Sequence, residues 1–556
     1  MNRTDVEPQA PLSPAAAQYV VESNTPIADA ADAAPAPDDD ASASIPAQLG
    51  RASTWGFTGR TVLLLANFGS APFTIRLLGP SAYGLWALVH TIMDWAAPAE
   101  AGQAAATTKY GAERYAAHDA DGESTVVWSG LCFILMTTGS VAVALALAAH
   151  FLLGLLHVHG SLLAAGTWAL RVACGTFVLS SLVGAVNTAQ QVRLRWKQFT
   201  LFNMLSNVLG AVGVPFAVFL FSGGVVTAAA VSLLASCLYF VSLTWDALRV
   251  QPALRHPRFS RATLSKLVSY GWALALAGLA SVPLASAERF FLAANASTTA
   301  VAYYAVAMTV ATTLEVLPQQ ICSPLMPALA RLQADGKEAE HRALYGKTLA
   351  GLFLVLAPAA ILVAFLARPF LTLWAGPTYG THGTVVLLVA LVGMSANGLA
   401  WVPNAYILSA GKTKAFAALQ GAELPCYLGA AWVLTARWGA LGAAIVWSAR
   451  LVVDSVAQSL IVRKSGGLPT LPFSSKRIRS VAAPALLAIM CIAIGMDTHG
   501  ILARSGIAVG LLVVYAAGVW YIVLTSRERE GVINLVMEIL GRDIRPRRSK
   551  PAHALR

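Results

Sequence analysis

Apolar runs of about 18 residues or more recur along almost the whole of this 556-residue chain, separated by short polar connections. An α-helix needs a run of about that length to cross the hydrocarbon core of a bilayer. Hydrophobic residues make up 57% of the sequence, and charged residues only 12%, roughly half the share usual in soluble domains. Because backbone within lipid must satisfy its own hydrogen bonds, the sequence predicts an all-α polytopic membrane protein.

Fourteen apolar segments are expected, with short connections on both sides of the membrane. Twelve form two sets of six, and two follow at the C-terminal side. Their approximate ranges are 56–78, 83–108, 125–150, 160–186, 199–220, 224–248, 267–292, 300–328, 348–370, 383–409, 416–435, 439–462, 478–496 and 505–525.

The two sets of six look like an internal repeat. The spacing of Tyr83 and Pro98 recurs 220 residues later in Tyr303 and Pro318. Pro-interrupted apolar segments at corresponding positions of two halves are typical of transporters, and an even number of segments per half makes the repeat parallel. The predicted division is an acidic tail at 1–50, an N-terminal lobe at 51–250, a C-terminal lobe at 263–465, two further helices at 476–525 and an amphipathic, basic tail at 526–556.

The distribution of charge predicts the orientation. Residues 1–50 carry eight acidic residues and one basic residue, and their composition predicts a disordered segment. The formal net charge of +12 comes from the rest of the chain, where basic residues gather in alternate loops. Such a bias predicts that these loops and both termini are cytoplasmic. All but seven of the 39 basic residues then lie on that side, the seven being Arg76, Arg171, Arg289, Arg368, Arg437, Arg450 and Arg504.

A short turn, Arg76-Leu77-Leu78-Gly79-Pro80-Ser81-Ala82-Tyr83-Gly84, separates the first two segments, because Pro disfavours helical dihedrals in the residue before it. With the segment count and the Lys/Arg pairs that open the fifth and eleventh segments, this turn resembles the Wzx-type polysaccharide-export flippases. That family shares a superfamily with the MATE drug exporters and the lipid II flippase. The resemblance covers about residues 51–525. It implies two lobes around an alternating cavity in the bacterial inner membrane, and an undecaprenyl-pyrophosphate-linked oligosaccharide as cargo.

Four arginines within or near the membrane are candidate ligands of the pyrophosphate. An intramembrane arginine is costly and needs a partner or a wet cavity, and its planar guanidinium suits phosphate groups. Arg171 and Arg450 are expected at mid-depth, one in each lobe, although Asp454 one turn from Arg450 could simply neutralise it. Arg76 and Arg289 are expected near the outer ends of the first and seventh segments, where reaching toward lipid phosphates is the alternative.

Four intramembrane acids are candidates for coupling transport to protons or sodium: Asp94, Glu100, Glu315 and Glu423. Salt bridges to the arginines are the equal alternative. No metal site or other cofactor is predicted, since the six cysteines lie singly in apolar segments. We expect membrane lipids, and assembly proteins such as a polysaccharide polymerase, as partners.

Two other functions stay open at this point. A cation-coupled small-molecule or drug antiporter of the same superfamily is the alternative transporter, although such proteins usually stop at twelve segments. A membrane polymerase is the enzymatic alternative, but its long outer loop has no counterpart here. We expect a protein that is not an enzyme and, lacking a basic and aromatic array, does not bind nucleic acid.

Overall fold

The computed structural model describes residues 45–279, 281–466, 478–495 and 501–524, together with residues 526, 529, 530 and 533. These residues are helical almost throughout, which confirms the predicted all-α class. Most of the two predicted tails, 1–50 and 526–556, lies outside the described residues. The first described helix begins at Ile45, inside the range expected for the acidic tail.

Ten helices in the described ranges are long and apolar enough to cross a membrane. Two of these helices are too long for a single crossing. Each consists of two helical parts that join at a glycine. Gly79 breaks α2 (Ile45–Ala96) with a φ of 74°, and Gly439 breaks α17 (Thr413–Gly466) with a φ of 54°. Positive φ is accessible to glycine because it has no Cβ. The break at Gly79 confirms the predicted turn, whereas the count of fourteen crossings stays a prediction.

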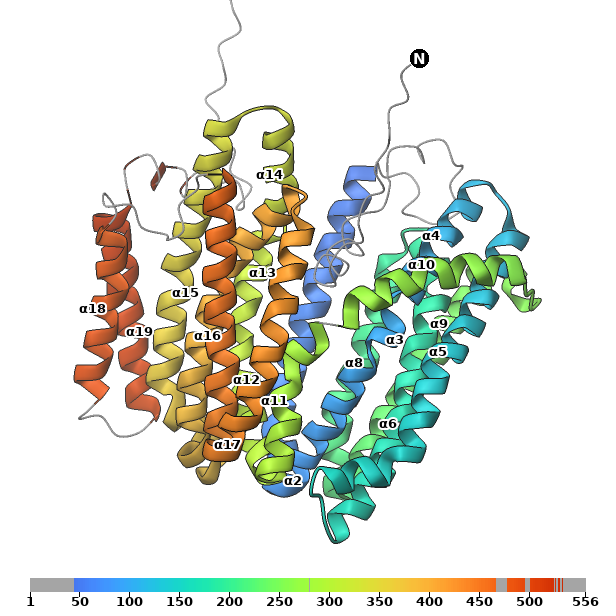
Figure 1. Cartoon of the computed structure of the whole chain (residues 1–556), viewed down its shortest axis with the longest axis horizontal. Coiled ribbons are helices and arrows are strands. Elements are labelled where there is room, and N and C mark those ends of the chain that lie inside the picture. The colour runs from blue at the N-terminus through green and yellow to red at the C-terminus, as the bar shows by residue number, and fades with distance from the viewer. Residues whose placement is uncertain are drawn as a thin grey trace, which may run out of the picture.

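The N-terminal lobe is one bundle, on the right of Figure 1. Its long helices are α2, α5 (Ala120–Leu155), α6 (Ser161–Val186), α8 (Trp196–Leu220) and α9 (Val225–Val250). Helix α6 packs between α5 and α9, and α8 packs against α2. Three short helices complete the lobe: α3 (Pro98–Ala101), α4 (Gln103–Ala116) and α7 (Thr188–Gln191).

The C-terminal lobe forms the second bundle, with α18 and α19 at its outer side (Figure 1). Helix α16 packs against α12, α15 and α17, while α18 and α19 pack on α15. Two elements lead into this lobe from the N-terminal one: η1 (Pro252–Arg255), which packs on α5 and α9, and α10 (Arg261–Leu279). The elements that follow are α11 (Ser281–Asn295), α12 (Thr298–Thr312), η2 (Thr313–Glu315), α13 (Val316–Cys322), α14 (Leu325–Ala334), α15 (Glu338–Trp374), α16 (Pro377–Ser409), α17, α18 (Ile478–Gly495), α19 (Ile501–Gly518) and η4 (Val519–Val523).

The expected seventh segment, 267–292, is divided between α10 and α11. Helix α10 runs across the N-terminal lobe and packs against α3, α4 and α5 (Figure 1). Two glycines permit this close crossing, because a Cβ added to Gly102 would lie 1.9 Å from the carbonyl oxygen of Gly271. Hydropathy alone does not reveal such a break, since both parts are apolar.

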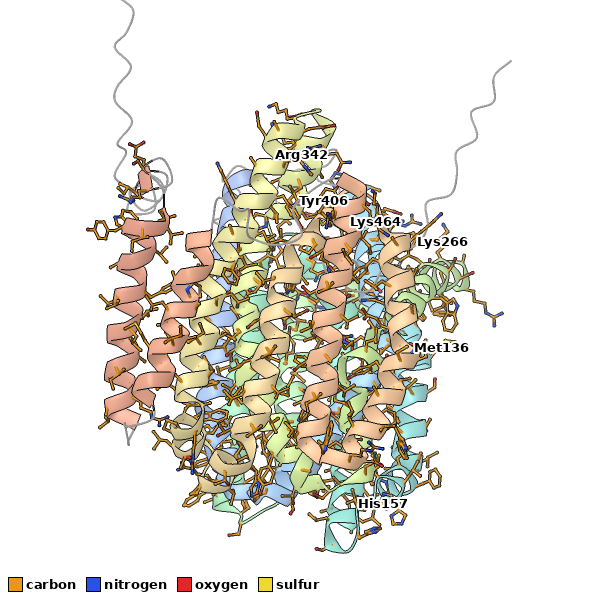
Figure 2. All side chains as sticks on the ribbon, turned by 60° about the vertical axis from the view of Figure 1, so that its left-hand side comes forward. Met136, His157, Lys266, Arg342, Tyr406 and Lys464 are labelled. Atoms are coloured by element: carbon orange, nitrogen blue, oxygen red, sulfur yellow. The ribbon has the colours of Figure 1, made fainter. Side chains whose placement is uncertain are left out.

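The two ends of the molecule differ in charge. Figure 2 shows Lys266, Arg342 and Lys464 at one end, here called the basic end, and His157 at the opposite end, here called the distal end. Near the basic end Arg193 forms a two-pronged contact with Glu123, with Nη1–Oε1 and Nη2–Oε2 distances of 2.6 and 2.9 Å. The clustering of cations at one end agrees with the charge bias on which the predicted orientation depends.

The two lobes are also in direct contact toward the distal end. A Cβ added to Gly84 of α2 would lie 1.7 Å from the carbonyl oxygen of Thr298 at the start of α12. The hydroxyls of Ser81 and Thr299 are 2.9 Å apart, and Trp374 Nε1 donates to the carbonyl oxygen of Phe68 at 3.1 Å. The buried core continues from α2 into α12 through this contact. The distal halves of the lobes are therefore packed together.

Candidate functional site

Arg289 lies where the second arm of α2 faces α11, at the boundary between the lobes. Its Nη1 donates to Thr91 Oγ1 at 3.4 Å. One turn further along α2, Trp95 Nε1 donates to Ser286 Oγ at 2.9 Å, and its ring meets that of Phe290 edge-on with centroids 4.8 Å apart. Residues of both lobes thus surround the guanidinium, about twelve residues or ~18 Å of helix from the break at Gly79.

Asp94 lies on the same arm of α2, and its side chain is exposed. It lies within electrostatic range of Arg289. The Arg289 side chain is itself 24% exposed, so its charge is neither fully buried nor fully solvated. A partly exposed cation between two lobes, with an acid in its electrostatic surroundings, is suited to bind an anionic ligand.

Glu288 points the other way, into the C-terminal lobe. Its side chain is fully buried. Tyr304 of α12 donates to Oε1 at 2.9 Å, and Tyr427 of α17 donates to Oε2 at 2.5 Å. Arg289 Nε lies 3.8 Å from Oε1. Buried charge is costly unless it is paired and hydrogen-bonded, and Glu288 is both.

Arg450 extends this network on α17. Its guanidinium lies 5.7 Å from the ring centroid of Tyr427, and it is within electrostatic range of Glu423 and Asp454. Asp454 accepts a hydrogen bond of 2.8 Å from Gln458. Among the described residues Arg450 Nε, Glu423 Oε1 and Asp454 Oδ1 are buried without a hydrogen-bond partner. Arg289 and Arg450 are therefore the two ends of one polar network through Glu288 and Tyr427.

Arg171 is placed elsewhere. Its side chain is exposed, Nε donates to the carbonyl oxygen of Ala146 at 3.2 Å, and the guanidinium lies 5.1 Å from the ring centroid of Trp168. Gly166 faces Leu85 of α2, and five residues along a helix turn the side chain by about 140°. Arg171 thus points away from α2, and it does not join the network around Arg289.

The remaining candidates lie apart from this network. Glu100 accepts a hydrogen bond of 3.1 Å from Ser181 in the N-terminal lobe. Glu315 accepts one of 3.3 Å from Asn397 in the C-terminal lobe. Each of these hydrogen bonds thus joins two elements of the same lobe. Arg76 lies near the distal end, where it donates across the lobe boundary to the carbonyl oxygen of Leu373.

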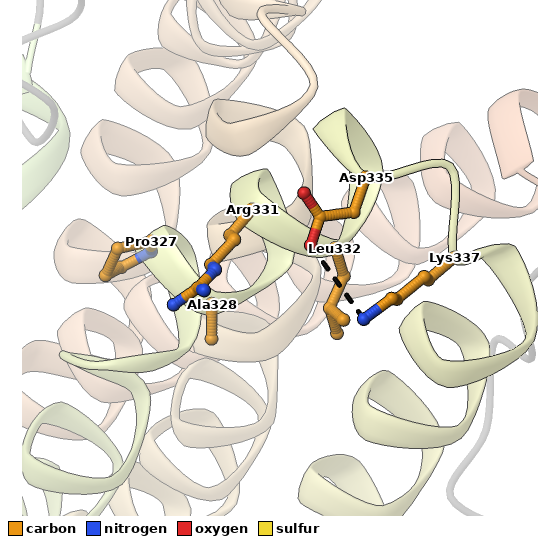
Figure 3. A pocket seen from close by; sticks show the side chains of 6 residues that line it. All are labelled: Pro327, Ala328, Arg331, Leu332, Asp335 and Lys337. Atoms are coloured by element: carbon orange, nitrogen blue, oxygen red, sulfur yellow. Dashed lines mark ion pairs between the residues drawn. The ribbon is translucent and has the colours of Figure 1, made fainter.

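Two hollows among the described residues lie outside the network. One is an apolar groove between the first arm of α2 and α8, which Arg76 also lines. The other, of about 530 Å³, lies at the basic end where α14 turns into α15 (Figure 3). Arg331 and Lys337 line it, and Lys337 is 4.0 Å from Asp335. Solvent-exposed ion pairs of this kind contribute little to the stability of the fold.

Comparison with known proteins identifies the family of this chain. Residues 74–381, more than half of the chain, match the polysaccharide biosynthesis protein family. The chain belongs to this family. The matched range includes Asp94, Arg171 and Arg289, whereas Glu423 and Arg450 lie beyond it. A Shigella flexneri protein with the provisional name O-antigen transporter is 24% identical over 411 residues, which cover 73% of this chain and 95% of that protein.

Solved structures share the fold of this polysaccharide biosynthesis protein. The lipid II flippase MurJ in an inward closed conformation gives a TM-score of 0.67 at 12% identity, covering 88% of this chain and 99% of MurJ. An inward-facing MATE multidrug transporter gives 0.60 at 16% identity, covering 73% of this chain and 94% of that one. An outward-facing MATE structure gives 0.52. This likeness agrees with the all-α polytopic membrane fold predicted from the sequence.

The sequence alone did not identify Glu288 and Tyr427 as parts of the site. Adjacent residues on a helix point about 100° apart, so the two side chains serve different sides of α11. An intramembrane acid is a candidate functional group by default, and that rule could have singled out Glu288.

Proposed function

We propose that this protein flips an undecaprenyl-pyrophosphate-linked oligosaccharide from the inner to the outer leaflet of the bacterial inner membrane, for exopolysaccharide, capsule or O-antigen biosynthesis. Family membership and the likeness to an O-antigen transporter and a lipid II flippase support the substrate class. The observation that carries the mechanism is the position of Arg289, a partly exposed cation held between the two lobes.

In this proposal the basic end and both termini face the cytoplasm, as the charge bias favours. The lobes are packed together toward the distal, periplasmic end through Gly84 and Thr298. The structure then corresponds to a state closed to the periplasm. The higher TM-score with the inward-facing than with the outward-facing MATE structure supports this assignment. A rocking motion of the two lobes would open the distal end and close the basic end.

Arg289 is the proposed first ligand of the pyrophosphate, with Asp94 as the group that the anion displaces. A guanidinium can donate two parallel hydrogen bonds to a phosphate and keeps its charge at any relevant pH. Arg450 supports the site through Tyr427 and Glu288, and Arg76 serves the headgroup at the periplasmic side. Arg171 is left out of the cargo site because it points away from α2.

Coupling to an ion is assigned to Glu423 and Asp454. These two acids share Arg450 as a nearby cation, so the group carries one negative charge in excess when both acids are ionised. One proton or one sodium ion would balance it. We assign Glu100 and Glu315 a structural role, because each accepts a side-chain hydrogen bond that joins two elements of its own lobe.

The test is transport by the purified protein in proteoliposomes containing a lipid-linked oligosaccharide. Arg289→Ala and Arg450→Ala are expected to stop appearance of the glycan in the opposite leaflet. Arg368→Ala removes an exposed cation of α15 and serves as the matched control. Flipping by Arg289→Ala at the wild-type rate, in protein that still inserts and elutes as a single species, would remove Arg289 from the mechanism.

The same experiment separates the competing functions. We propose that the glycan leaves the protein chemically unchanged, so its chain length is expected to stay constant, whereas longer chains would indicate a polymerase. Transport of a cationic drug, with no movement of the lipid-linked glycan, would favour the drug antiporter. A separate polymerase and other assembly proteins are the proposed partners that act on the flipped product.

A further inference from the structure

The apolar groove lies between residues 65–77 of α2 and residues 212–219 of α8. Near the basic end the two helices are in contact, since a Cβ added to Gly59 would lie 2.7 Å from Thr200 Cγ2. Ten residues further along α2, a Cβ added to Gly69 would meet no atom within 4 Å. The groove has a volume of about 660 Å³.

The groove is apolar except at one end. Leu65, Phe73, Phe216 and Phe219 line it, and each is more than 60% exposed. Side chains of this kind on the outside of a membrane bundle face lipid. Arg76 lies at the distal end of the groove, three residues before the break at Gly79. An apolar channel that ends at a single cation matches an amphiphile with one anionic head.

The length of the groove identifies the amphiphile more closely. Leu65 and Arg76 are eleven residues apart on one helix, or ~16 Å along its axis. Half of the ~30 Å hydrocarbon core, the depth of one leaflet, is about the same. The groove therefore fits one acyl chain of a lipid in the leaflet at the distal end, with the phosphate at the level of Arg76. A long polyprenyl chain would extend beyond it.

Arg76 has donors to spare for a phosphate. Its guanidinium donates to the carbonyl oxygen of Leu373 on α15, but arginine carries five N–H groups. Its side chain is exposed. A phosphate bound there would also neutralise the charge at the point where the lobes meet. The position proposed for the phosphate therefore lies next to the contact between the lobes.

We infer that this groove is a binding site for an anionic phospholipid of the distal leaflet, with one acyl chain between α2 and α8 and the phosphate on Arg76. The site is separate from the network around Arg289, although Arg76 is also the proposed contact of the cargo headgroup at the periplasmic side. Through this site, the lipid composition of the distal leaflet would influence the contact between the lobes at the distal end.

Native mass spectrometry of the purified full chain, titrated with phosphatidylglycerol, tests this inference. Arg76→Gln is expected to weaken the tightest binding event about fivefold, since one basic residue near a membrane surface contributes about that factor. Gly69→Leu is expected to remove the same event while the charge stays, because its side chain would fill the groove. Leucine also favours a helix more than glycine does, so the protein should fold.

Two control variants match these changes. Arg368→Gln removes another exposed cation, and Gly139→Leu adds a side chain on α5 where no atom lies within 4 Å. Both should bind phosphatidylglycerol as the wild type does. Unchanged binding by Arg76→Gln and Gly69→Leu would overturn the inference. So would equal losses in the controls, or a groove that takes up polyprenyl phosphate but no phospholipid.

Discussion

Tyr427 donates a 2.5 Å hydrogen bond to Oε2 of Glu288, although 139 residues separate them. The bond joins α17 to α11 inside the C-terminal lobe, and Glu288 is adjacent in sequence to Arg289 at the boundary between the lobes. Through this bond the position of Arg289 depends on the packing of α17. The network is therefore both a support for the proposed cargo site and a large part of the polar interior of the lobe.

The first prediction concerns the stability of that interior. Tyr427→Phe is expected to lower the free energy of unfolding by about 1.5–3 kcal/mol, the range for hydrogen bonds to charged groups. Thermal unfolding of the purified protein measures the effect. Tyr521→Phe changes a side chain that is 71% exposed and should leave the transition in place. A Tyr427→Phe protein as stable as the wild type would show that Glu288 does not need this donor.

The second prediction concerns the buried ion pair near the basic end. Arg193 and Glu123 have side chains only 10% and 2% exposed, so removing one partner leaves a buried charge. Arg193→Met is expected to cost about 3–5 kcal/mol. The double substitution Arg193→Met with Glu123→Leu should recover most of this loss. If the double variant is no more stable than Arg193→Met, the cost arises from packing rather than from charge.

The third prediction concerns the contact between the lobes at the distal end. Gly84→Leu places a side chain where the Thr298 carbonyl lies, so the lobes must separate there. We expect increased thiol labelling of cysteines introduced at Ser81 and Thr299 by a reagent added at the distal side. Gly154→Leu, at a position with no atom within 4 Å, is the control. Labelling that stays at the wild-type level would mean that the distal contact adapts without opening.

The fourth prediction concerns ion coupling. Glu423→Gln removes one of the two acids that share Arg450, and the remaining group is neutral overall without a bound ion. Flipping driven by a proton or sodium gradient is expected to lose its dependence on that gradient, while exchange at equilibrium continues. Proteoliposomes with and without an imposed gradient provide the comparison. Gradient dependence equal to that of the wild type would exclude Glu423 as the coupling group.

Much of the fold could be predicted because single residues carry strong local preferences. The Gly79-Pro80 pair ended one helix as predicted, and the apolar runs coincide with the long helices. The exception is the seventh segment, which divides into α10 and α11. Its crossing over α3 depends on two glycines, Gly102 and Gly271, that are far apart in the chain. Hydropathy along one segment carries no information about such a contact.

The candidate site was predicted only in part, for a related reason. The cost of a charge in an apolar run singles out Arg171 and Arg450 at mid-depth and, less strongly, Arg76 and Arg289 near the outer ends, because this cost follows from the residue and its neighbours in the chain. Which of them face a partner depends on helix rotation and on helices far along the chain. The structure placed Arg289 between the lobes and Arg171 on an exposed face.

The sequence by itself determined that the chain is a helical membrane protein with basic loops on one side, because these properties follow from hydrophobicity and charge added up along the chain. Only the tertiary structure decided that Glu288, Tyr304, Tyr427 and Arg450 form one network behind Arg289. The physical reason is that a buried polar group is stable only when donors and acceptors from other helices meet it at hydrogen-bonding distance. That condition is met by packing in three dimensions.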